Sequence, residues 1–473
     1  MKRIFLICYA AVSIWAILSV LVNGRRASRS FGWIITILML PILGPSIYYL
    51  FGVNRRKFKF YKLKKNSIRQ LYDEKYSQSK ITNPTIEFSS DTLTRLSTII
   101  TKSTTVSAYN GNEVEIYQTG VKSFESIFSA IKTAKKFIHI QYYILANGTI
   151  LDKLIELLAS KIKEGVEVRV LYDSVGSFSF SGKLKKRLKS VGIKAFPTMP
   201  LRFGNFMYTL NYRNHRKIVI IDGVIGFVGG VNISDKYIGS DKELGIWSDI
   251  HLRIKGPAVD SLHRVFIKDY HFASGEKVLP SETYLPQIEE SGHSKVQIVT
   301  SGPDSKQPTI MYQYLSMIAL ARKRVCIANP YFIPGSSVYN ALVTASLGGT
   351  DVNLLLPNKS DSKIAKYSMY ANFEGLMEAG VHIYLRKDFS HSKAIIIDDE
   401  LVSVGSGNFD VRSFEHNFET NALIYDEKIA KEIVKEFNSH CTKDILLDLK
   451  KFKKRSYFQK MKEGYSKLFS PLL

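Results

Sequence analysis

The sequence predicts an α/β protein in which two similar α/β units share one site, preceded by an N-terminal hairpin of two transmembrane helices. Three observations support this prediction. A short motif of the form His-x-Lys-x-x-x-x-Asp occurs twice, a similar order of strand and helix patterns precedes both copies, and two long uncharged runs lie near the N-terminus. A repeat of this kind indicates a duplicated structural unit.

The two motif copies share a pattern that places the histidine and lysine side chains together. Their residues are His215, Lys217 and Asp222 in the first copy and His391, Lys393 and Asp398 in the second. Four apolar residues follow each lysine, which is typical of a buried strand. Histidine and lysine are two positions apart, so their side chains point to the same face. Such a pair can hold a phosphate, with lysine as a point charge and histidine as nucleophile or acid.

The segments before each motif repeat as well. The paired apolar segments are 137–144 with 325–333, 165–171 with 349–356, and 192–196 with 380–384. Helical patterns separate the first two segments of each set, so both halves are expected to follow the order strand, helix, strand, helix, strand, motif. A pseudo-two-fold relation between the halves would bring the motifs face to face. The sequence therefore predicts one site with two histidines and two lysines.

Two uncharged runs at the N-terminus predict a membrane hairpin over residues 1–52. Residues 4–22 and 31–51 each approach the ~20 residues that cross ~30 Å of hydrocarbon. A cleaved signal peptide is the alternative for the first run, but no suitable cleavage site follows and a second run comes at once. Nine cations flank the hairpin and three lie in its turn, which places both ends and the catalytic part in the cytoplasm.

Charge and composition bound the remaining segments. The chain has 66 Lys and Arg against 42 Asp and Glu, a net charge of +24 that favours an anionic partner. Residues 53–107 are expected to be a basic juxtamembrane segment and linker, whose run Arg55–Lys65 would lie on anionic headgroups. The three cysteines show no disulfide or metal spacing. The expected first half is 108–280 and the second half 281–473, which ends in a basic tail.

Two further segments bear on lipid contact. An apolar, aromatic insertion between Pro197 and Asn211 has no counterpart in the second half, and it suits either acyl-chain contact or ordinary core packing. The tail from Lys450 onward is basic and aromatic, and is expected to be a second surface anchor.

Several segments resemble the phospholipase D superfamily, and in particular the family of bacterial cardiolipin synthases. Besides the doubled motif, these segments are 214–223, 229–232, 330–334, 405–413 and 417–419. The resemblance implies that His215 attacks phosphorus to give a phosphatidyl-histidine. It implies that His391 protonates the leaving oxygen and later deprotonates the incoming hydroxyl. Near-symmetry leaves open an exchange of these two roles.

The resemblance also assigns roles to further candidate site residues. Lys217 and Lys393 would bind the nonbridging oxygens together with Asn232 and Asn408. Ser406, which stands where the first half has Gly230, would add a hydroxyl to the phosphate site. Asp249 and Glu419 lie where the family has carboxylates that orient the histidines. Asp222 and Asp398 complete the catalytic motifs, although at strand ends they are expected to hold loops rather than touch substrate.

Lysine, asparagine and histidine side chains can neutralise, attack and protonate a phosphodiester, so neither a metal nor a cofactor is expected. The implied reaction joins two phosphatidylglycerol molecules into cardiolipin and glycerol at an anionic membrane surface. The implied location is the bacterial cell membrane, with more than one span and no nucleic-acid partner. The sequence leaves the oligomeric state open.

Three other functions compete with this prediction. A phospholipase D, or a phosphatidyltransferase that uses another alcohol, would need the same motifs. A nuclease would suit the positive charge but would gain nothing from two membrane spans. A lipid-binding scaffold without activity would not need both motif copies intact.

Overall fold

The computed structural model describes residues 2–23, 27–40, 42–52, 86–88, 90–178, 182–200, 211–239, 245, 247–276, 283–284, 286–305, 307–470 and 473. Two predicted features lie outside these residues: the basic run Arg55–Lys65 and most of the insertion between Pro197 and Asn211.

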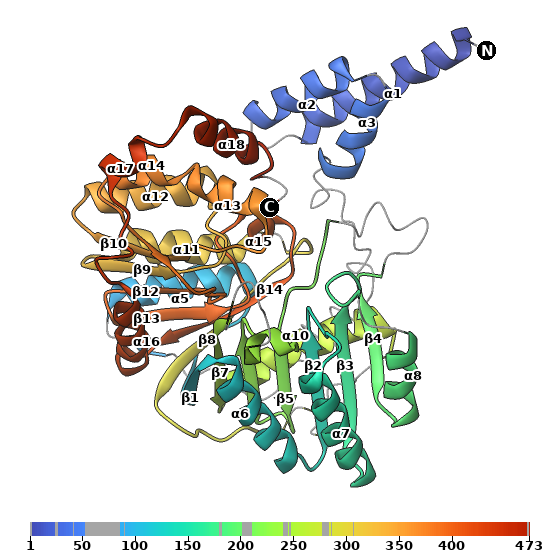
Figure 1. The fold of residues 1–473 in the computed structure, drawn as a ribbon. Helices are drawn as coiled ribbons and strands as arrows, with labels where there is room; N and C mark the ends of the chain where they lie inside the picture. The colour runs from blue at the N-terminus through green and yellow to red at the C-terminus, as the bar shows by residue number, and fades with distance from the viewer. Residues whose placement is uncertain are drawn as a thin grey trace.

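A 14-stranded sheet runs through both halves of the chain (Figure 1). The first seven strands are β1 (Tyr109–Thr119), β2 (Phe137–Tyr142), β3 (Glu167–Asp173), β4 (Lys194–Thr198), β5 (Ile218–Ile221), β6 (Ile225–Gly229) and β7 (Ser248–Lys255). The other seven are β8 (Ser294–Ser301), β9 (Arg324–Ala328), β10 (Asp351–Pro357), β11 (His382–Arg386), β12 (Ala394–Ile397), β13 (Leu401–Gly405) and β14 (Glu419–Tyr425).

The strand order has two-fold character about the contact between β1 and β8. The sheet reads β11-β10-β9-β12-β13-β14-β8-β1-β7-β6-β5-β2-β3-β4. Outward from the centre, the first half runs β1-β7-β6-β5-β2-β3-β4 and the second repeats it as β8-β14-β13-β12-β9-β10-β11. The predicted α/β fold of two repeated units is therefore confirmed.

The motif strands β5 and β12 lie inside the sheet. Each consists of four fully buried apolar residues, as expected for a strand covered on both faces. β5 pairs antiparallel with β2 and β6, and β12 pairs in the same way with β9 and β13. The histidine that precedes each strand therefore lies at the end of a strand that is hydrogen-bonded on both sides, which fixes its position in the middle of its unit.

Helices cover both faces of the sheet. In the first half these are α6 (Gly120–Thr133), α7 (Thr149–Lys163), α8 (Gly182–Ser190), the 3-10 helix η3 (Asp235–Ile238) and α10 (Ala258–Ser274). In the second half they are α11 (Thr309–Leu320), α12 (Gly335–Leu347), α13 (Lys363–Tyr370), α14 (Phe373–Glu378), α15 (Val411–Glu415) and α16 (Glu427–His440). Leu262 on α10 and Phe437 on α16 belong to one buried cluster, so a continuous apolar core joins the halves.

The segment expected to be a linker contains a helix that packs into the second half. α5 (Asp91–Thr104) begins at an N-cap, where the Ser90 hydroxyl accepts a hydrogen bond from the Leu93 N–H. Leu96 and Ile100 are fully buried in the same cluster as Met317 of α11. Burial of these side chains makes α5 part of the second unit, although it precedes the first unit in sequence.

The N-terminal helices form a small cluster of their own. They are α1 (Lys2–Asn23), α2 (Ala27–Met39), α3 (Leu43–Ile47) and the π-helical turn η1 (Tyr48–Gly52), and they project from the body in Figure 1. Ala16, Val20, Ile37 and Tyr48 pack together, and the Tyr48 hydroxyl donates to Ser19 Oγ at 3.0 Å. Within the described residues, no helix has both the length and the apolar character needed to cross a membrane.

Two short helices end the chain. They are α17 (Leu449–Lys453) and α18 (Tyr457–Lys467), and α18 packs against α13. Glu463 of α18 is almost fully buried, and its carboxylate accepts hydrogen bonds from Nε of Arg455 at 2.9 and 3.1 Å. This buried ion pair fixes the rotation of α18 on the second unit.

The aspartates at the ends of the motif strands fix the adjacent turns. Asp222 and Asp398 have φ values of 51° and 53°. The Asp222 carboxylate accepts hydrogen bonds from three backbone N–H groups, those of residues 135 to 137, at 2.7 to 2.8 Å. Asp398 does the same with the N–H groups of residues 322 to 324. Each carboxylate therefore ties its motif strand to the start of the neighbouring antiparallel strand, β2 or β9.

Removal of either carboxylate is expected to destabilise the fold. Asp222→Ala or Asp398→Ala would leave partly buried N–H groups without acceptors, at a cost of about 1–3 kcal/mol. Asp222→Asn, the matched control, keeps one acceptor oxygen and tolerates the positive φ, so it should lose less. Denaturant unfolding of the three purified variants and the parent protein measures the difference. Unchanged unfolding midpoints in both alanine variants would refute the anchoring role.

Candidate active site

Each motif histidine is held by the backbone of the opposite half. The His215 N–H donates to the Phe418 carbonyl at 3.0 Å, directly before β14. In the equivalent contact of the other half, the His391 N–H donates to the Ser248 carbonyl at 2.8 Å, at the start of β7. The two loops thus cross between the units, and the predicted single site with both motifs is present.

Glu419 is the carboxylate partner of His215. Nδ1 of His215 lies 3.0 and 3.1 Å from the two carboxylate oxygens of Glu419. The carboxylate also accepts hydrogen bonds from Ser406 at 2.5 Å, Ser413 at 2.9 Å and Asn417 at 3.2 Å. Burial raises the pKa of Glu419, but His215, Lys217 and Ser406 outweigh burial and lower the pKa overall. Glu419 is therefore an ionised acceptor that fixes the His215 proton on Nδ1.

Asp249 is the carboxylate partner of His391. Nδ1 of His391 lies 2.7 Å from Asp249 Oδ2 and 3.2 Å from the Tyr237 hydroxyl. Burial raises the pKa of Asp249 to about 6, because Lys393 and other nearby cations offset the burial only partly. This second pair is thus close to titrating near neutral pH, whereas the pair of His215 and Glu419 is not.

The carboxylates are exchanged between the halves. Asp249 follows His215 in sequence but contacts His391, and Glu419 follows His391 but contacts His215. Sequence reasoning selected both carboxylates as orienting residues from their positions, but those positions do not reveal which histidine each one meets. The crossed pairing requires both halves for either histidine to be oriented.

Both histidines are neutral and have one nitrogen available. Burial lowers the pKa of His215, with Glu419 opposing the shift. Burial also lowers the pKa of His391 well below its usual value, and Lys393, Lys217 and His215 add to the shift. Nδ1 of each ring is occupied, and Nε2 has no hydrogen-bond partner among the residues that the structure describes. With the ring proton on Nδ1, facing the carboxylate, each Nε2 carries a lone pair that can attack or accept a proton.

Lys217 and Lys393 are buried cations beside the histidines, with 0% and 1% of their surface exposed. Nζ of each lysine donates to the carbonyl of the histidine two residues before it. Burial lowers the pKa of both lysines, and the nearby carboxylates oppose the shift. An anion bound beside both ammonium groups would favour their charged forms, so the site is suited to a phosphate.

The candidate phosphate-binding side chains differ in the hydrogen bonds that they make within the protein. The Asn232 amide is engaged within the protein, since Oδ1 accepts from the Ile144 N–H at 3.2 Å and Nδ2 donates to Tyr237 at 3.1 Å. Asn408 Oδ1 is buried without a hydrogen-bond partner in the described part of the chain. The Ser406 hydroxyl donates to Glu419 and so supports the histidine pair, while its contact with a phosphate stays a prediction.

The difference between Gly230 and Ser406 has a steric cause. A Cβ atom at position 230 would lie 2.1 Å from Asp249 Oδ1, so only glycine fits there. At the equivalent position of the second half, Ser406 fits and its hydroxyl bonds to Glu419. The first half therefore has no side chain at position 230, whereas the Ser406 hydroxyl of the second half stabilises the Glu419 carboxylate.

Asp222 and Asp398, which the motif placed among the catalytic candidates, lie away from the histidines. The histidine precedes a four-residue strand and the aspartate follows it. Because an extended chain advances about 3.3 Å per residue, the two side chains lie at opposite ends of the strand. Their carboxylates bind backbone N–H groups, as the prediction of a loop-holding role requires. No group of three or more His, Cys, Asp or Glu side chains in the described ranges could hold a metal ion.

Sequence reasoning did not select a polar network behind His215. Arg216 is buried, and its NH1 group donates to both carboxylate oxygens of Asp269 at 2.8 Å. Asp269 also accepts from Asn214 Nδ2 at 2.8 Å and from Gln141 Nε2 at 2.6 Å. Nε of Arg216 donates to the Glu419 carbonyl at 3.3 Å, which links the network to the opposite half. The available signal was Arg216 inside the first motif, where the second motif has a serine.

The family models and the relatives that match this chain point to the same family. The family described as "Cardiolipin synthase, PLD-like domain" matches residues 127–269 and 314–441, and "Phospholipase_D-nuclease N-terminal" matches residues 11–52. "Cardiolipin synthase 2" of Bacillus anthracis is 38% identical over 464 residues, covering 96% of this chain and 88% of that protein. "Cardiolipin synthase 2" of Staphylococcus epidermidis is 36% identical over 471 residues, covering 97% of this chain and 96% of that protein.

A solved structure supports the same fold. The phosphatidylserine synthase of Haemophilus influenzae superposes with a TM-score of 0.61 at 15% identity, over 81% of this chain and 100% of that one. At this identity the likeness concerns the fold alone. The family match over both halves and the identity to relatives over nearly the whole chain lead to one conclusion: the chain belongs to the cardiolipin synthase family of phospholipase D-like enzymes.

Proposed function

We propose that the enzyme transfers a phosphatidyl group from one phosphatidylglycerol to another, giving cardiolipin and glycerol through a phosphatidyl-histidine. The observation that carries this proposal is the pair of buried, neutral histidines, each oriented by the carboxylate of the other half. Two buried lysines beside them supply charge for the phosphate. This arrangement provides a nucleophile, an acid and charge neutralisation in one site.

In the first step, Nε2 of His215 attacks phosphorus and the bond from phosphorus to the glycerol oxygen breaks. His215 is the better nucleophile because Glu419 stays ionised and stabilises the positive charge that develops on the ring. His391 donates a proton to the leaving oxygen. The anionic phosphate offsets the two lysines that lower the pKa of His391, so substrate binding favours the protonated ring that this step needs.

In the second step, the hydroxyl of another phosphatidylglycerol attacks the phosphatidyl-histidine. His391 accepts the hydroxyl proton, the new phosphorus–oxygen bond forms, and the bond to His215 Nε2 breaks. Lys217 and Lys393 remain beside the phosphate through both steps, with Asn232 and Asn408 at its edge. Water in place of the lipid hydroxyl would instead give phosphatidic acid, the product of a phospholipase D.

Both histidines are expected to be essential. His215→Ala and His391→Ala should each reduce turnover by at least about 1000-fold, because each removes a group that acts on the reacting atoms. His391→Asn keeps the nucleophile and should accumulate phosphatidyl-enzyme slowly. The measurement is lipid analysis and intact-protein mass after incubation with phosphatidylglycerol alone. Turnover at the parent rate in either alanine variant rules out the two-histidine mechanism, and phosphatidic acid as the main product replaces the transferase with a phospholipase.

The rate should fall in acid because of Asp249. Its pKa is raised to about 6, so the carboxylate becomes protonated as pH falls through that value and stops accepting the Nδ1 proton of His391. Turnover measured between about pH 5 and 8 should therefore show an acidic limb near 6. Asp249→Asn should be slow and lack this limb, while Glu419→Gln should be slow and retain it, because the Glu419 pKa is lowered. A rate independent of pH in the parent would contradict this assignment.

We also propose that the enzyme works at an anionic membrane surface, anchored by residues 4–22 and 31–51 as two spans with the catalytic units in the cytoplasm. Supporting this, α1 exposes large apolar side chains, including Val22 at 71% and Ile7 at 68%. α18 exposes Tyr457 at 79% and Leu468 at 74% beside the basic residues of α17. Aromatic and cationic side chains together favour a headgroup region.

Removal of the exposed apolar side chains of α18 and of the residue that follows it should lower enzyme activity on membranes only. We expect replacement of Tyr457, Phe458, Tyr465 and Leu468 by serine to lower activity on phosphatidylglycerol vesicles and to spare activity on detergent-dispersed substrate. Leu347→Ser on α12 is the matched control, since Leu347 is 71% exposed and lies on another helix. Equal losses with vesicles and micelles would mean that α18 supports the fold or the site, and membrane docking through α18 would be wrong.

A further inference from the structure

A cavity lies directly behind the second motif. About 40 Å³ of it is open to the centre of a water molecule, it widens into solvent at its mouth, and Ser390 and Ser392, which flank His391, form part of its wall. Ser248, the neighbour of Asp249, and Gln118 of β1 line it from the first half. Neighbouring residues of an extended segment point to opposite faces, so the serines face the cavity while His391 faces the catalytic site.

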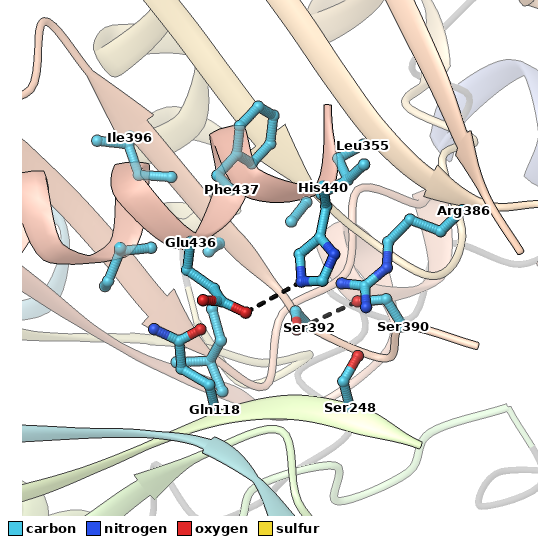
Figure 2. A pocket seen from close by; sticks show the side chains of 14 residues that line it. Gln118, Ser248, Leu355, Arg386, Ser390, Ser392, Ile396, Glu436, Phe437 and His440 are labelled. Atoms are coloured by element: carbon cyan, nitrogen blue, oxygen red, sulfur yellow. Dashed lines mark hydrogen bonds and ion pairs between the residues drawn. The ribbon is translucent and has the colours of Figure 1, made fainter. Parts of the chain in front are cut away.

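The cavity exists because the second half has small side chains where the first half has large polar ones. Motif alignment and strand register define the equivalent positions: Gln141 and Ala328 each pair with the residue three positions after the motif histidine. The equivalent residues are Gln141 and Ala328, Asn214 and Ser390, and Arg216 and Ser392. The first-half side chains form the network around Asp269, and their smaller counterparts leave open space (Figure 2).

The cavity wall offers hydrogen-bonding capacity that the protein does not use. Ser248 Oγ is buried and has no hydrogen-bond partner among the described residues. The Ser390 hydroxyl donates to Ser392 Oγ at 3.3 Å, which leaves the Ser392 hydroxyl hydrogen for a ligand. A buried polar atom without a partner costs free energy, so a polar guest at this end of the cavity would be favoured.

The side chains that line the cavity include charged groups of both signs, each with a hydrogen-bond partner. Nε and NH2 of Arg386 donate to the Asp388 carboxylate at 2.9 and 2.6 Å. His440 Nε2 lies 3.0 Å from Glu436 Oε1, and both side chains point into the cavity in Figure 2. A free anion would meet Glu436 here, and a free cation would meet Arg386. Hydroxyl groups, which both donate and accept, match this mixed lining.

We propose that the cavity binds a small neutral polyol whose hydroxyl groups reach Ser248, Ser392 and Glu436. Apolar side chains, among them Ile433 and Phe437, provide a surface for its carbon chain. Occupancy acts on catalysis through the backbone, since the serines that bind the guest are neighbours of His391 and Asp249. The glycerol that the enzyme releases has this chemistry, and its role as the physiological guest rests on the proposed function.

The test is saturation-transfer NMR of glycerol with the full-length protein in detergent. Ala328→Gln restores the side chain of the first half and should abolish the part of the glycerol signal that arises in the cavity. Ser248→Ala removes one partner and should weaken binding about fivefold, the effect of one net hydrogen bond. Leu347→Gln adds the same side chain on an exposed site and should leave the glycerol signal at the parent level. Ala328→Gln and Ser248→Ala both retain the catalytic histidines, so a change in the glycerol signal reports on the cavity.

Kinetics provides an independent readout of occupancy. Inhibition of the parent should rise with the square of the glycerol concentration, since glycerol binds at the catalytic site and in the cavity, whereas Ala328→Gln should show linear inhibition. A glycerol signal unchanged in both variants overturns the proposal, and so does inorganic phosphate displacing glycerol from the cavity. If the parent makes no cardiolipin but the variants lose the glycerol signal, the proposed function fails and the polyol site stands.

Discussion

The exchange of carboxylates between the two halves is the contact on which the rest of the structure depends. Neither unit can orient its own histidine, because Glu419 of the second half holds His215 and Asp249 of the first half holds His391. Backbone hydrogen bonds from each histidine loop to the opposite half accompany both pairs. The continuous sheet and the shared apolar core keep the units in the position that these short contacts need. Duplication thus gives the site a mutual dependence that a single unit lacks.

The two halves are alike in topology and unlike in electrostatics. Glu419 has several hydrogen-bond donors and stays ionised, whereas Asp249 has fewer donors and a raised pKa. Arg216 and Asp269 brace the first histidine loop from behind, and serines with a cavity take their place behind the second. A rigid, permanently charged pair suits a nucleophile that must hold its position. A pair that titrates near neutral pH suits a group that exchanges protons in both directions.

Burial determines the electrostatics of the site. Lys217 and Lys393 lie almost without solvent contact, and their charges are balanced by two carboxylates that are themselves hydrogen-bonded to the histidines. In such surroundings charge interactions are stronger than in water, so an anionic substrate changes the protonation of its neighbours as it binds. In the proposed mechanism, substrate binding and proton transfer are therefore linked through the same four charged groups.

The sequence by itself determined the duplication, the order of strands and helices along the chain before each motif, and the choice of candidate site residues. These features follow from local patterns: the spacing of histidine and lysine, the apolar strands after them, and the polar positions that repeat downstream. Tertiary structure decided which carboxylate meets which histidine, because that choice depends on the crossing of chains far apart in sequence. It also decided that Ser406 supports Glu419, that α5 packs into the second unit, and that a cavity replaces Arg216 behind His391. Each of these outcomes depends on side-chain volumes and on distances between segments that no local pattern encodes.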